Sequence, residues 1–227
     1  MADFWTADTH FFHCAVVRYC NRPWKNVTKD NMEEHDSAMI ALWNGIVSKG
    51  DTVRILGDFA WKNHNKYLGR LNGKKILVMG NHDKMPLEVL KNFTQVIPEP
   101  VASNCKLNVI KIDGREFYCT HFPSRTWYKS HYGVPNLFGH THGRMQTWNL
   151  SFDVGVDTKL AGLKPIPHEV VLQEIDRRMQ MMEVEGRVRF ENGKKLWMQD
   201  DVSYWRNKFL KQQNEEIVEI QENEEDE

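Results

Sequence analysis

Residues 52–58 read Thr-Val-Arg-Ile-Leu-Gly-Asp, and this stretch decides the fold class of the 227-residue chain. It is a short, largely apolar run closed by a glycine and an acidic residue, which is typical of a strand buried on both faces. Residues 3–8 are a similar apolar run closed by Asp8, and residues 75–79 are one followed by Gly80. Between the three runs, residues 30–49 have apolar side chains at helical spacing and residues 63–71 predict a second, shorter helix. This strand–helix–strand–helix–strand order predicts a parallel-rich sheet with helices packed outside it.

The first predicted helix has its own boundary signals. Asp30 is a candidate N-cap with Glu33 three residues further on, and Gly50 follows the last apolar residues of the segment. We therefore expect this helix to run from about Asp30 to Lys49.

The second half of the chain predicts shorter elements. Residues 107–113 and 116–121 form a predicted hairpin around Asp113-Gly114, followed by strands at 136–139 and 152–156. Residues 168–183 and 203–220 have helical spacing. The whole pattern indicates a mixed, layered α/β fold. We expect a domain at 1–183, a partly helical extension at 184–220 and a disordered acidic tail at 221–227, because that tail has nothing apolar to bury.

Composition excludes several classes of protein. The chain of 26.7 kDa is long enough for one globular domain with a large core. It has no run of 18 apolar residues and no basic segment before an apolar one at its start, so we expect a cytoplasmic protein without a membrane span. Its four cysteines form no C-x-x-C pair and are expected to be reduced.

The net charge of −1 is unevenly distributed along the sequence. Residues 211–227 carry −7, which leaves +6 on residues 1–210. A body of that charge suits an anionic substrate, but it is too weak to argue for nucleic-acid binding.

Short clusters of metal-ligand side chains lie where the predicted strands end. They are Asp8-x-His10, Gly57-Asp58, Gly80-Asn81-His82-Asp83, Thr120-His121 and Gly139-His140-Thr141-His142. Sites in open α/β sheets form at the carboxyl ends of strands, so these clusters are expected to converge. Two residues apart, the members of each Asp-x-His or His-x-His pair should point to one side of an extended chain. The glycines before Asp58, Asn81 and His140 should let the backbone turn sharply.

Each cluster alone is also compatible with a surface turn or a core histidine, but their joint occurrence predicts a metal site. Mixed carboxylate, imidazole and amide ligands favour Mn, Fe or Zn over Mg or Ca. Two such ions about 3.5–4 Å apart can hold both a hydroxide and a phosphoryl oxygen. The predicted chemistry is therefore hydrolysis of phosphate esters.

The set of motifs over residues 3–157 resembles the calcineurin-like metallophosphoesterases. That resemblance implies two mixed sheets packed face to face with helices outside. It also implies two divalent transition metals, with Mn expected first and Fe, Zn or Ni as alternatives, and in-line attack by a metal-bridging hydroxide. The implied ligands are Asp8, His10, Asp58 and His142 for one metal and Asp58, Asn81, His121 and His140 for the other. His82 is the implied leaving-group acid or charge stabiliser, and Asp83 beside it is a second catalytic candidate.

Further motifs are similar to those of small bacterial and phage phosphoesterases: Asp8-Thr9-His10-Phe11-x-His13, Asn21-Arg22-Pro23, Leu56-Gly57-Asp58-Phe59 and His121-Phe122-Pro123. One motif departs from the protein phosphatases of the superfamily, which carry Gly-Asp-x-x-Asp-Arg-Gly. Here Trp61 and Lys62 stand in place of the second Asp and the Arg, and Asp83 stands in place of a Glu. We therefore expect a small phosphodiester or nucleotide as substrate. A protein phosphatase and a non-catalytic binding scaffold are the alternatives.

Several residues are candidates for substrate binding. His13 either contacts the substrate phosphate or hydrogen-bonds a loop, and Arg18, Arg22 and Arg125 either clamp phosphate or lie solvated on the surface. The aromatics Trp127, Tyr128 and Tyr132 either stack on a nucleobase or fill the base of a loop. Aromatic residues after position 184, such as Trp197, are expected to pack on the body or on a second protomer, so the chain is predicted to be a monomer or a homodimer.

Overall fold

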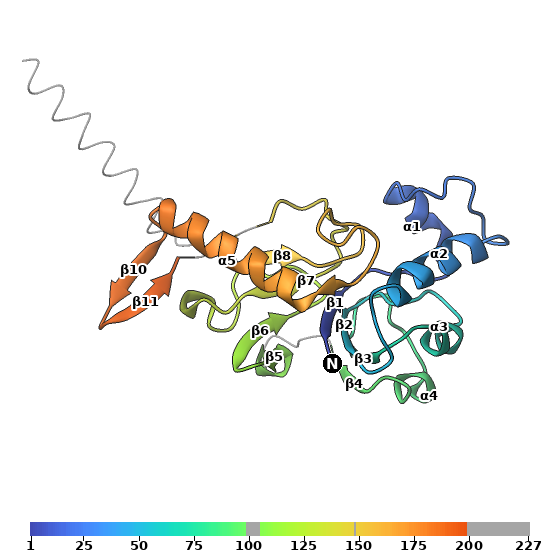
Figure 1. Cartoon of the computed structure of the whole chain (residues 1–227), viewed down its shortest axis with the longest axis horizontal. Coiled ribbons are helices and arrows are strands. Elements are labelled where there is room, and N and C mark those ends of the chain that lie inside the picture. Colours follow the sequence, from blue (N-terminus) through green and yellow to red (C-terminus); the bar gives the residue numbers. More distant parts are fainter. Residues whose placement is uncertain (99–104, 148, 199–227) are drawn as a thin grey trace, which may run out of the picture.

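Two β-sheets, each mixing parallel and antiparallel strands, form the body of the protein (Figure 1). The computed structural model describes residues 1–98, 105–147 and 149–198. The predicted helix at 203–220 and the predicted disordered tail at 221–227 lie outside the described residues. The arrangement confirms the predicted fold of two mixed sheets flanked by helices.

The first sheet has the strand order β4-β3-β2-β1-β9. Strands β1 (Asp3–Thr6), β2 (Thr52–Leu56), β3 (Lys74–Val78) and β4 (Gln95–Ile97) are parallel, and β9 (Ile166–Pro167) is antiparallel to β1. The first three confirm the apolar runs found in the sequence. Their parallel pairing brings their carboxyl ends to one edge of the sheet.

The second sheet has the order β5-β6-β7-β8. Its strands are β5 (Val109–Ile112), β6 (Arg115–Cys119), β7 (Asn136–Phe138) and β8 (Ser151–Asp153). Strands β5 and β6 pair antiparallel around Asp113-Gly114, which confirms the predicted hairpin. Strands β6, β7 and β8 are parallel, so their carboxyl ends also share one edge.

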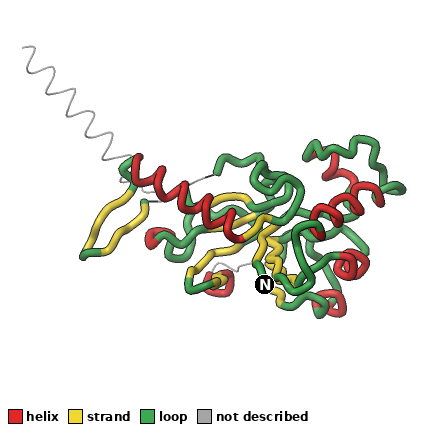
Figure 2. The backbone as a smooth tube through the Cα atoms, in the orientation of Figure 1, coloured by secondary structure: helices red, strands yellow, loops and turns green. Residues whose placement is uncertain are grey.

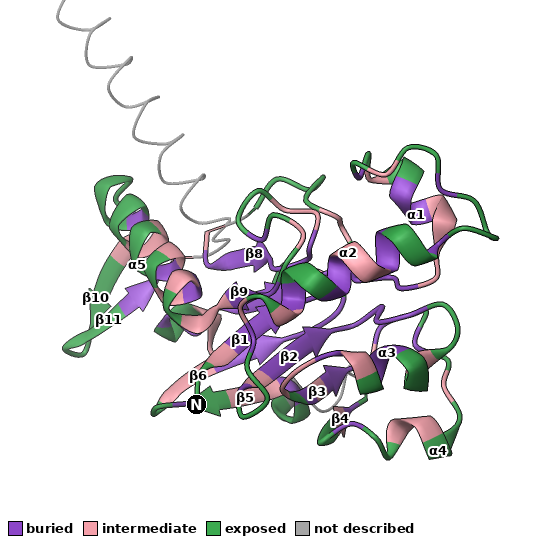
Figure 3. Cartoon of the chain, turned by 45° about the vertical axis from the view of Figure 1, so that its right-hand side comes forward, coloured by how far each residue is buried: buried purple, intermediate pink, exposed green. Residues whose placement is uncertain are grey.

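Side chains of β1 and β2 point alternately to the two faces of the first sheet, and each face has its own hydrophobic core. Trp5 and Leu56 pack in one core with Phe117 and Leu137 of the second sheet, while Val53 and its neighbours on the opposite face pack against helices. Successive strand residues point to opposite faces, which explains the division. Strands β1 and β2 are accordingly buried almost throughout (Figure 3).

Helices cover the first sheet on its outer side. These are α2 (Glu33–Asn44) and α3 (His64–Arg70), with the short α1 (Cys14–Tyr19) and α4 (Leu87–Leu90) beside them. Helix α2 is shorter than predicted: it begins after Met32 without a side-chain cap. At its other end the Asn44 side chain bonds the backbone of Arg70 and Asn72, so the helix stops where it docks on the loop after α3.

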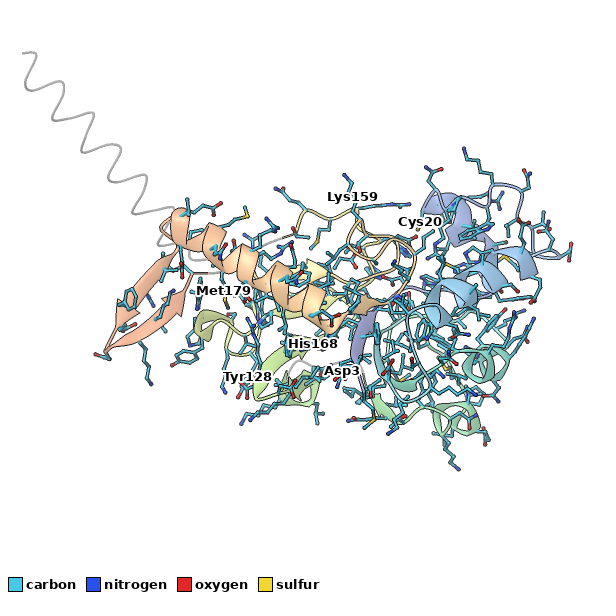
Figure 4. All side chains as sticks on the ribbon, viewed as in Figure 1. Asp3, Cys20, Tyr128, Lys159, His168 and Met179 are labelled. Carbon is cyan, nitrogen blue, oxygen red and sulfur yellow. The ribbon has the colours of Figure 1, made fainter. Side chains whose placement is uncertain are left out.

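Helix α5 (His168–Val184) confirms the long helix predicted near residue 168 and buries Val171, Ile175 and Met182 in the core shared by both sheets. At its start, His168 lies close to Asp3 of β1 (Figure 4) and accepts a hydrogen bond from Trp5 Nε1 at 2.9 Å. No helix in the described ranges is long and apolar enough to cross a membrane.

The described part of the predicted extension is a β-hairpin of β10 (Val188–Glu191) and β11 (Lys194–Trp197). Its Trp197 is buried against the body, next to the 3-10 turn η2 (Ser130–Tyr132). A second 3-10 turn, η1 (Cys105–Asn108), precedes β5. Of the two packing partners predicted for Trp197, the body of the same chain is therefore the one observed.

Candidate metal centre

The predicted ligands follow the carboxyl ends of strands from both sheets. Asp8 and His10 follow β1, Asp58 follows β2 and Asn81 follows β3, while His121 follows β6 and His140 and His142 follow β7. They all lie in loops and turns after these strands, and Figure 2 draws such segments in green. Backbone contacts tie the two edges together, because Val156 N donates to Ala7 O at 3.0 Å.

The first cluster consists of Asp8, His10 and His142, whose candidate ligand atoms all lie within 4.8 Å of one another. Asp8 is completely buried, and the backbone N–H of His140 donates to both of its carboxylate oxygens, at 3.0 and 2.8 Å. The rings of His10 and His142 stack with their centroids 5.2 Å apart. This arrangement can hold one ion on its carboxylate and two imidazoles.

Behind the first cluster, a buried ion pair orients His142. Its Nδ1 lies 2.7 Å from Asp157 Oδ2, while Arg22 donates to both oxygens of the same carboxylate at 2.7 and 2.8 Å. A histidine whose Nδ1–H donates to a carboxylate keeps the lone pair of Nε2 for a metal. The sulfur of Cys20 lies within 4.8 Å of candidate ligand atoms of both His142 and Asp157.

The second cluster consists of Asp58, His121 and His140, again with their candidate ligand atoms within 4.8 Å. His121 Nδ1 lies 2.8 Å from Leu56 O, so that nitrogen donates and Nε2 is left for a ligand contact. The Asn81 Oδ1 atom lies 2.9 Å from this Nε2. The group therefore combines a carboxylate, two imidazoles and an amide oxygen.

Asp58 connects the two clusters. Its Oδ2 lies 3.4 Å from His10 Nε2 in the first cluster and 3.4 Å from His121 Nε2 in the second. The backbone N–H of His82 donates to its other oxygen, Oδ1, at 2.9 Å. One carboxylate oxygen thus faces ligands of both clusters at once.

The backbone at the ligands is left-handed, not extended as the sequence pattern predicts. Positive φ angles between 48° and 68° occur at Asp8, His10, Asp58, His140 and His142. Such angles are costly for residues with a side chain and persist only where surrounding contacts enforce them. Here the N–H of Asp8 donates to Gly57 O and that of His10 to Asp58 O, both at 3.0 Å. These kinks, and not the two-residue repeat of a strand, direct the side chains.

The glycines serve the site in two ways. Gly57 has a φ of +88° and turns the chain sharply, as expected. Gly80 has no positive φ, but a Cβ on it would lie 2.5 Å from Asp58 Oδ1. It therefore permits close approach of the Asp58 carboxylate instead of a turn.

The electrostatics of the site fit bound cations. Burial raises the pKa of Asp8 to about 7. Burial alone would lower the pKa of His121, but its interactions with Asp58 and Asp8 raise it to about 9. Burial likewise opposes protonation of His142, and Asp157 nevertheless raises its pKa to about 10. Both imidazoles lie where the carboxylates stabilise positive charge, and a divalent ion would supply that charge.

The two catalytic candidates contact Asp58 in different ways, His82 at its carboxylate and Asp83 at its backbone N–H. The His82 side chain is exposed, with its ring 5.7 Å from that of His10 and 5.3 Å from that of Trp61. No hydrogen bond or ion pair involves the His82 ring within the described ranges. Asp83, the second catalytic candidate, is buried, and its oxygens accept the N–H groups of Asp58, Phe59 and Gly80 at 2.8–2.9 Å. Burial raises the pKa of Asp83 to about 6.

The candidate phosphate-binding residues are dispersed. Arg22 is 2% exposed and also donates to the carbonyl oxygens of Asp8 and Thr9, so it supports the first cluster instead of facing a substrate. Arg18 is exposed on α1 and Arg125 is exposed in the loop after β6. His13 does adjoin the site, with Nδ1 3.3 Å from His10 Nδ1.

The aromatic residues named from the sequence lie apart from the site. Trp127 is buried and donates to Val134 O, and Tyr128 packs on the same core. Both fill the base of the loop, which was the alternative to base stacking. Tyr132 is 51% exposed in η2.

Sequence reasoning missed Asp157 as the partner of His142, and Trp61 as the ring beside His13. The pattern that identified the ligands could have identified Asp157, because it too follows the end of a short buried strand, β8. No local signal placed Trp61, because its position depends on contacts between separate loops.

A family model described as calcineurin-like phosphoesterase matches residues 4–162. An uncharacterized protein of Methanocaldococcus jannaschii is 28% identical over 183 residues, covering 75% of this chain and 89% of its own length. The gene 66 protein of Mycobacterium phage D29 is 27% identical over 171 residues, covering 64% of this chain and 81% of its own length.

A solved structure supports the fold. The crystal structure of a protein of unknown function from Aquifex aeolicus aligns with a TM-score of 0.54 at 22% identity, covering 78% of this chain and 98% of that one. The family match covers the second sheet, strands β1 to β4 of the first sheet but not β9, and every ligand of the two clusters. The chain belongs to the calcineurin-like phosphoesterase family.

Proposed function

We propose that the protein is a two-metal phosphoesterase that hydrolyses a small phosphodiester or nucleotide. One observation carries this proposal: Asp58 Oδ2 lies 3.4 Å from an imidazole nitrogen of each cluster. A carboxylate in that position can bridge two ions, each completed by the ligands of its own cluster. Mn is the first candidate metal, and Fe, Zn and Ni are alternatives for a set of nitrogen and oxygen donors.

The proposed ligand sets are Asp8, His10, Asp58 and His142 for one ion and Asp58, Asn81, His121 and His140 for the other. Divalent ions held there would lower the pKa of water and neutralise charge on the phosphoryl oxygens. The chain keeps the ligands oriented, because Asp157 and Leu56 O fix the rings of His142 and His121 from behind.

His82 is the proposed proton donor to the leaving group. Its backbone is anchored to Asp58 Oδ1 at 2.9 Å, which sets its distance from the bridging carboxylate, and its exposed side chain can reach a substrate. Asp83 acts indirectly, because it holds the backbone of Asp58 and Gly80. It is a positioning residue.

Two observations favour a diester or nucleotide over a phosphoprotein. Arg22 is committed to Asp157, so its guanidinium fork is not available to a dianionic phosphate monoester. Trp61 and Lys62 stand where the protein-phosphatase motif has its Asp-Arg pair. A site without a bidentate arginine loses its best partner for a monoester.

The test is Asp58→Asn in the full chain, read by elemental analysis and by hydrolysis of bis(p-nitrophenyl) phosphate with Mn. We expect the native protein to hold close to two ions and the variant to lose both ions and activity, because one carboxylate serves both clusters. The matched control is Asp113→Asn, an exposed aspartate in the β5–β6 turn that also has a positive φ.

Metal content near zero in the native protein after Mn reconstitution would contradict the two-metal site. Native metal content without hydrolysis of any phosphoester would favour a binding scaffold. A phosphopeptide cleaved with higher kcat/KM than the diester would favour a protein phosphatase.

A further inference from the structure

A groove beside the metal centre has no part in the function proposed so far. It has a volume of about 440 Å³, and its walls include Phe12, His13, Lys29, Asp30, Trp61 and Lys62. His13 joins the groove to the centre, because its Nδ1 lies 3.3 Å from Nδ1 of the candidate ligand His10. A molecule in the groove would therefore lie one side chain away from the first cluster.

Trp61 is held rigidly at this groove. Its backbone N–H donates to Phe11 O at 2.8 Å, and the preceding Ala60 forms a β-bridge with Phe11. Its ring stacks on His13, with centroids 4.5 Å apart and planes inclined by 16°, yet the residue remains 45% exposed. An indole that is already held in place offers a flat surface to a ligand, and binding does not have to immobilise the side chain.

The groove also carries unpaired positive charge. Lys29 and Lys62 are exposed, and neither makes a hydrogen bond or an ion pair with the described residues. Asp30 is the carboxylate on the same wall, which leaves one net positive charge. The groove therefore combines an aromatic surface with cations that can meet a further anionic group.

We propose that this groove binds the nucleoside part of a nucleotide, with the base on Trp61 and an additional phosphate near Lys62 and Lys29. The inference rests on the proposed function in one respect: the phosphoryl group to be cleaved lies at the metal centre. A base joined to that group through a sugar would extend from the centre past His13 to Trp61. Base–aromatic stacking tolerates every base, so the groove selects nucleotides without selecting among the bases.

The test compares AMP with ribose 5-phosphate, which differ only by the base. Their dissociation constants for the Mn-loaded full chain are measured by isothermal titration calorimetry, which needs no turnover. We expect AMP to bind about tenfold more tightly, in the range for stacking of one base on an aromatic side chain. Trp61→Ala should remove that difference and leave ribose 5-phosphate unchanged, whereas Trp61→Phe should keep most of it.

The charge is tested with ADP and the variant Lys62→Gln. ADP should bind more tightly than AMP to the native chain, and the variant should lose most of that gain. Phe190→Ala, which removes a 74% exposed aromatic ring from β10, should change none of these constants.

Equal affinity of the native chain for AMP and ribose 5-phosphate, or no binding of either, would overturn the nucleoside site. So would a Trp61→Ala variant that still prefers AMP. The proposed function fails by a different result, namely a native chain that holds no metal or cleaves no phosphoester.

Discussion

At the scale of single residues, His82 differs from its neighbours because it hydrogen-bonds the Asp58 carboxylate through its backbone only. We expect His82→Asn to leave metal content unchanged and to lower kcat by about 10²–10⁴, the range for loss of a positioned general acid. A substrate with a poor leaving group should suffer more than one releasing nitrophenolate, which needs little protonation. Parallel kinetics and elemental analysis measure both effects.

The control for His82 is His131→Asn, which alters an exposed histidine in η2 and should change neither quantity. Loss of metal from His82→Asn would contradict the proposed role and make His82 a ligand. An equal loss of rate for good and poor leaving groups would favour charge stabilisation over proton donation.

At the scale of elements, α5 contributes to the core through few side chains. Ile175 is completely buried, whereas Met181 on the same helix is 47% exposed. Ile175→Ala should lower the free energy of unfolding by about 2–5 kcal/mol, because it removes buried methyl groups and leaves a cavity. Met181→Ala should stay within about 0.5 kcal/mol of the native value.

Urea denaturation of the metal-free protein measures both α5 variants without a contribution from ligand binding. Similar effects of the two substitutions would contradict the packing of α5 on the shared core. A loss confined to Ile175→Ala would show that the helix stabilises the fold through its buried face.

At the scale of the whole molecule, the site joins the two sheets. Asp8, Asp58 and Asn81 follow strands of the first sheet, and His121 and His140 follow strands of the second. Ions bound between them should stabilise the native state, by about 2.7 kcal/mol per site when Mn is present at 100 times its Kd. For a chain of this size that corresponds to a rise in Tm of about 5–10 °C per site.

Differential scanning calorimetry with Mn and with a chelator measures this stabilisation, and Asp58→Asn is the control that should show little of it. An identical Tm in both conditions would contradict a site that links the sheets. A rise that persists in Asp58→Asn would place the stabilising ion elsewhere.

Much of this architecture was predictable because the signals are local. The run at residues 52–56 is short, rich in β-branched residues and followed by a glycine, which favours a strand, and Asp113-Gly114 specifies its turn through its own backbone preferences. The boundaries of α2 were less predictable. Its last turn is decided by bonds from Asn44 to a loop more than 25 residues away, which no local pattern encodes.

Which residues could bind metal follows from the sequence, because carboxylate and imidazole side chains that follow buried parallel strands are brought to one edge of the sheet. The direction in which these side chains point depends on contacts between distant parts of the fold. The left-handed backbone at Asp8 and His10 is enforced by hydrogen bonds to the loop after β2. Contacts between distant segments also pair Arg22 with Asp157 and stack the Trp61 ring on His13. Such contacts depend on how two sheets pack together, and that is a property of the folded chain as a whole.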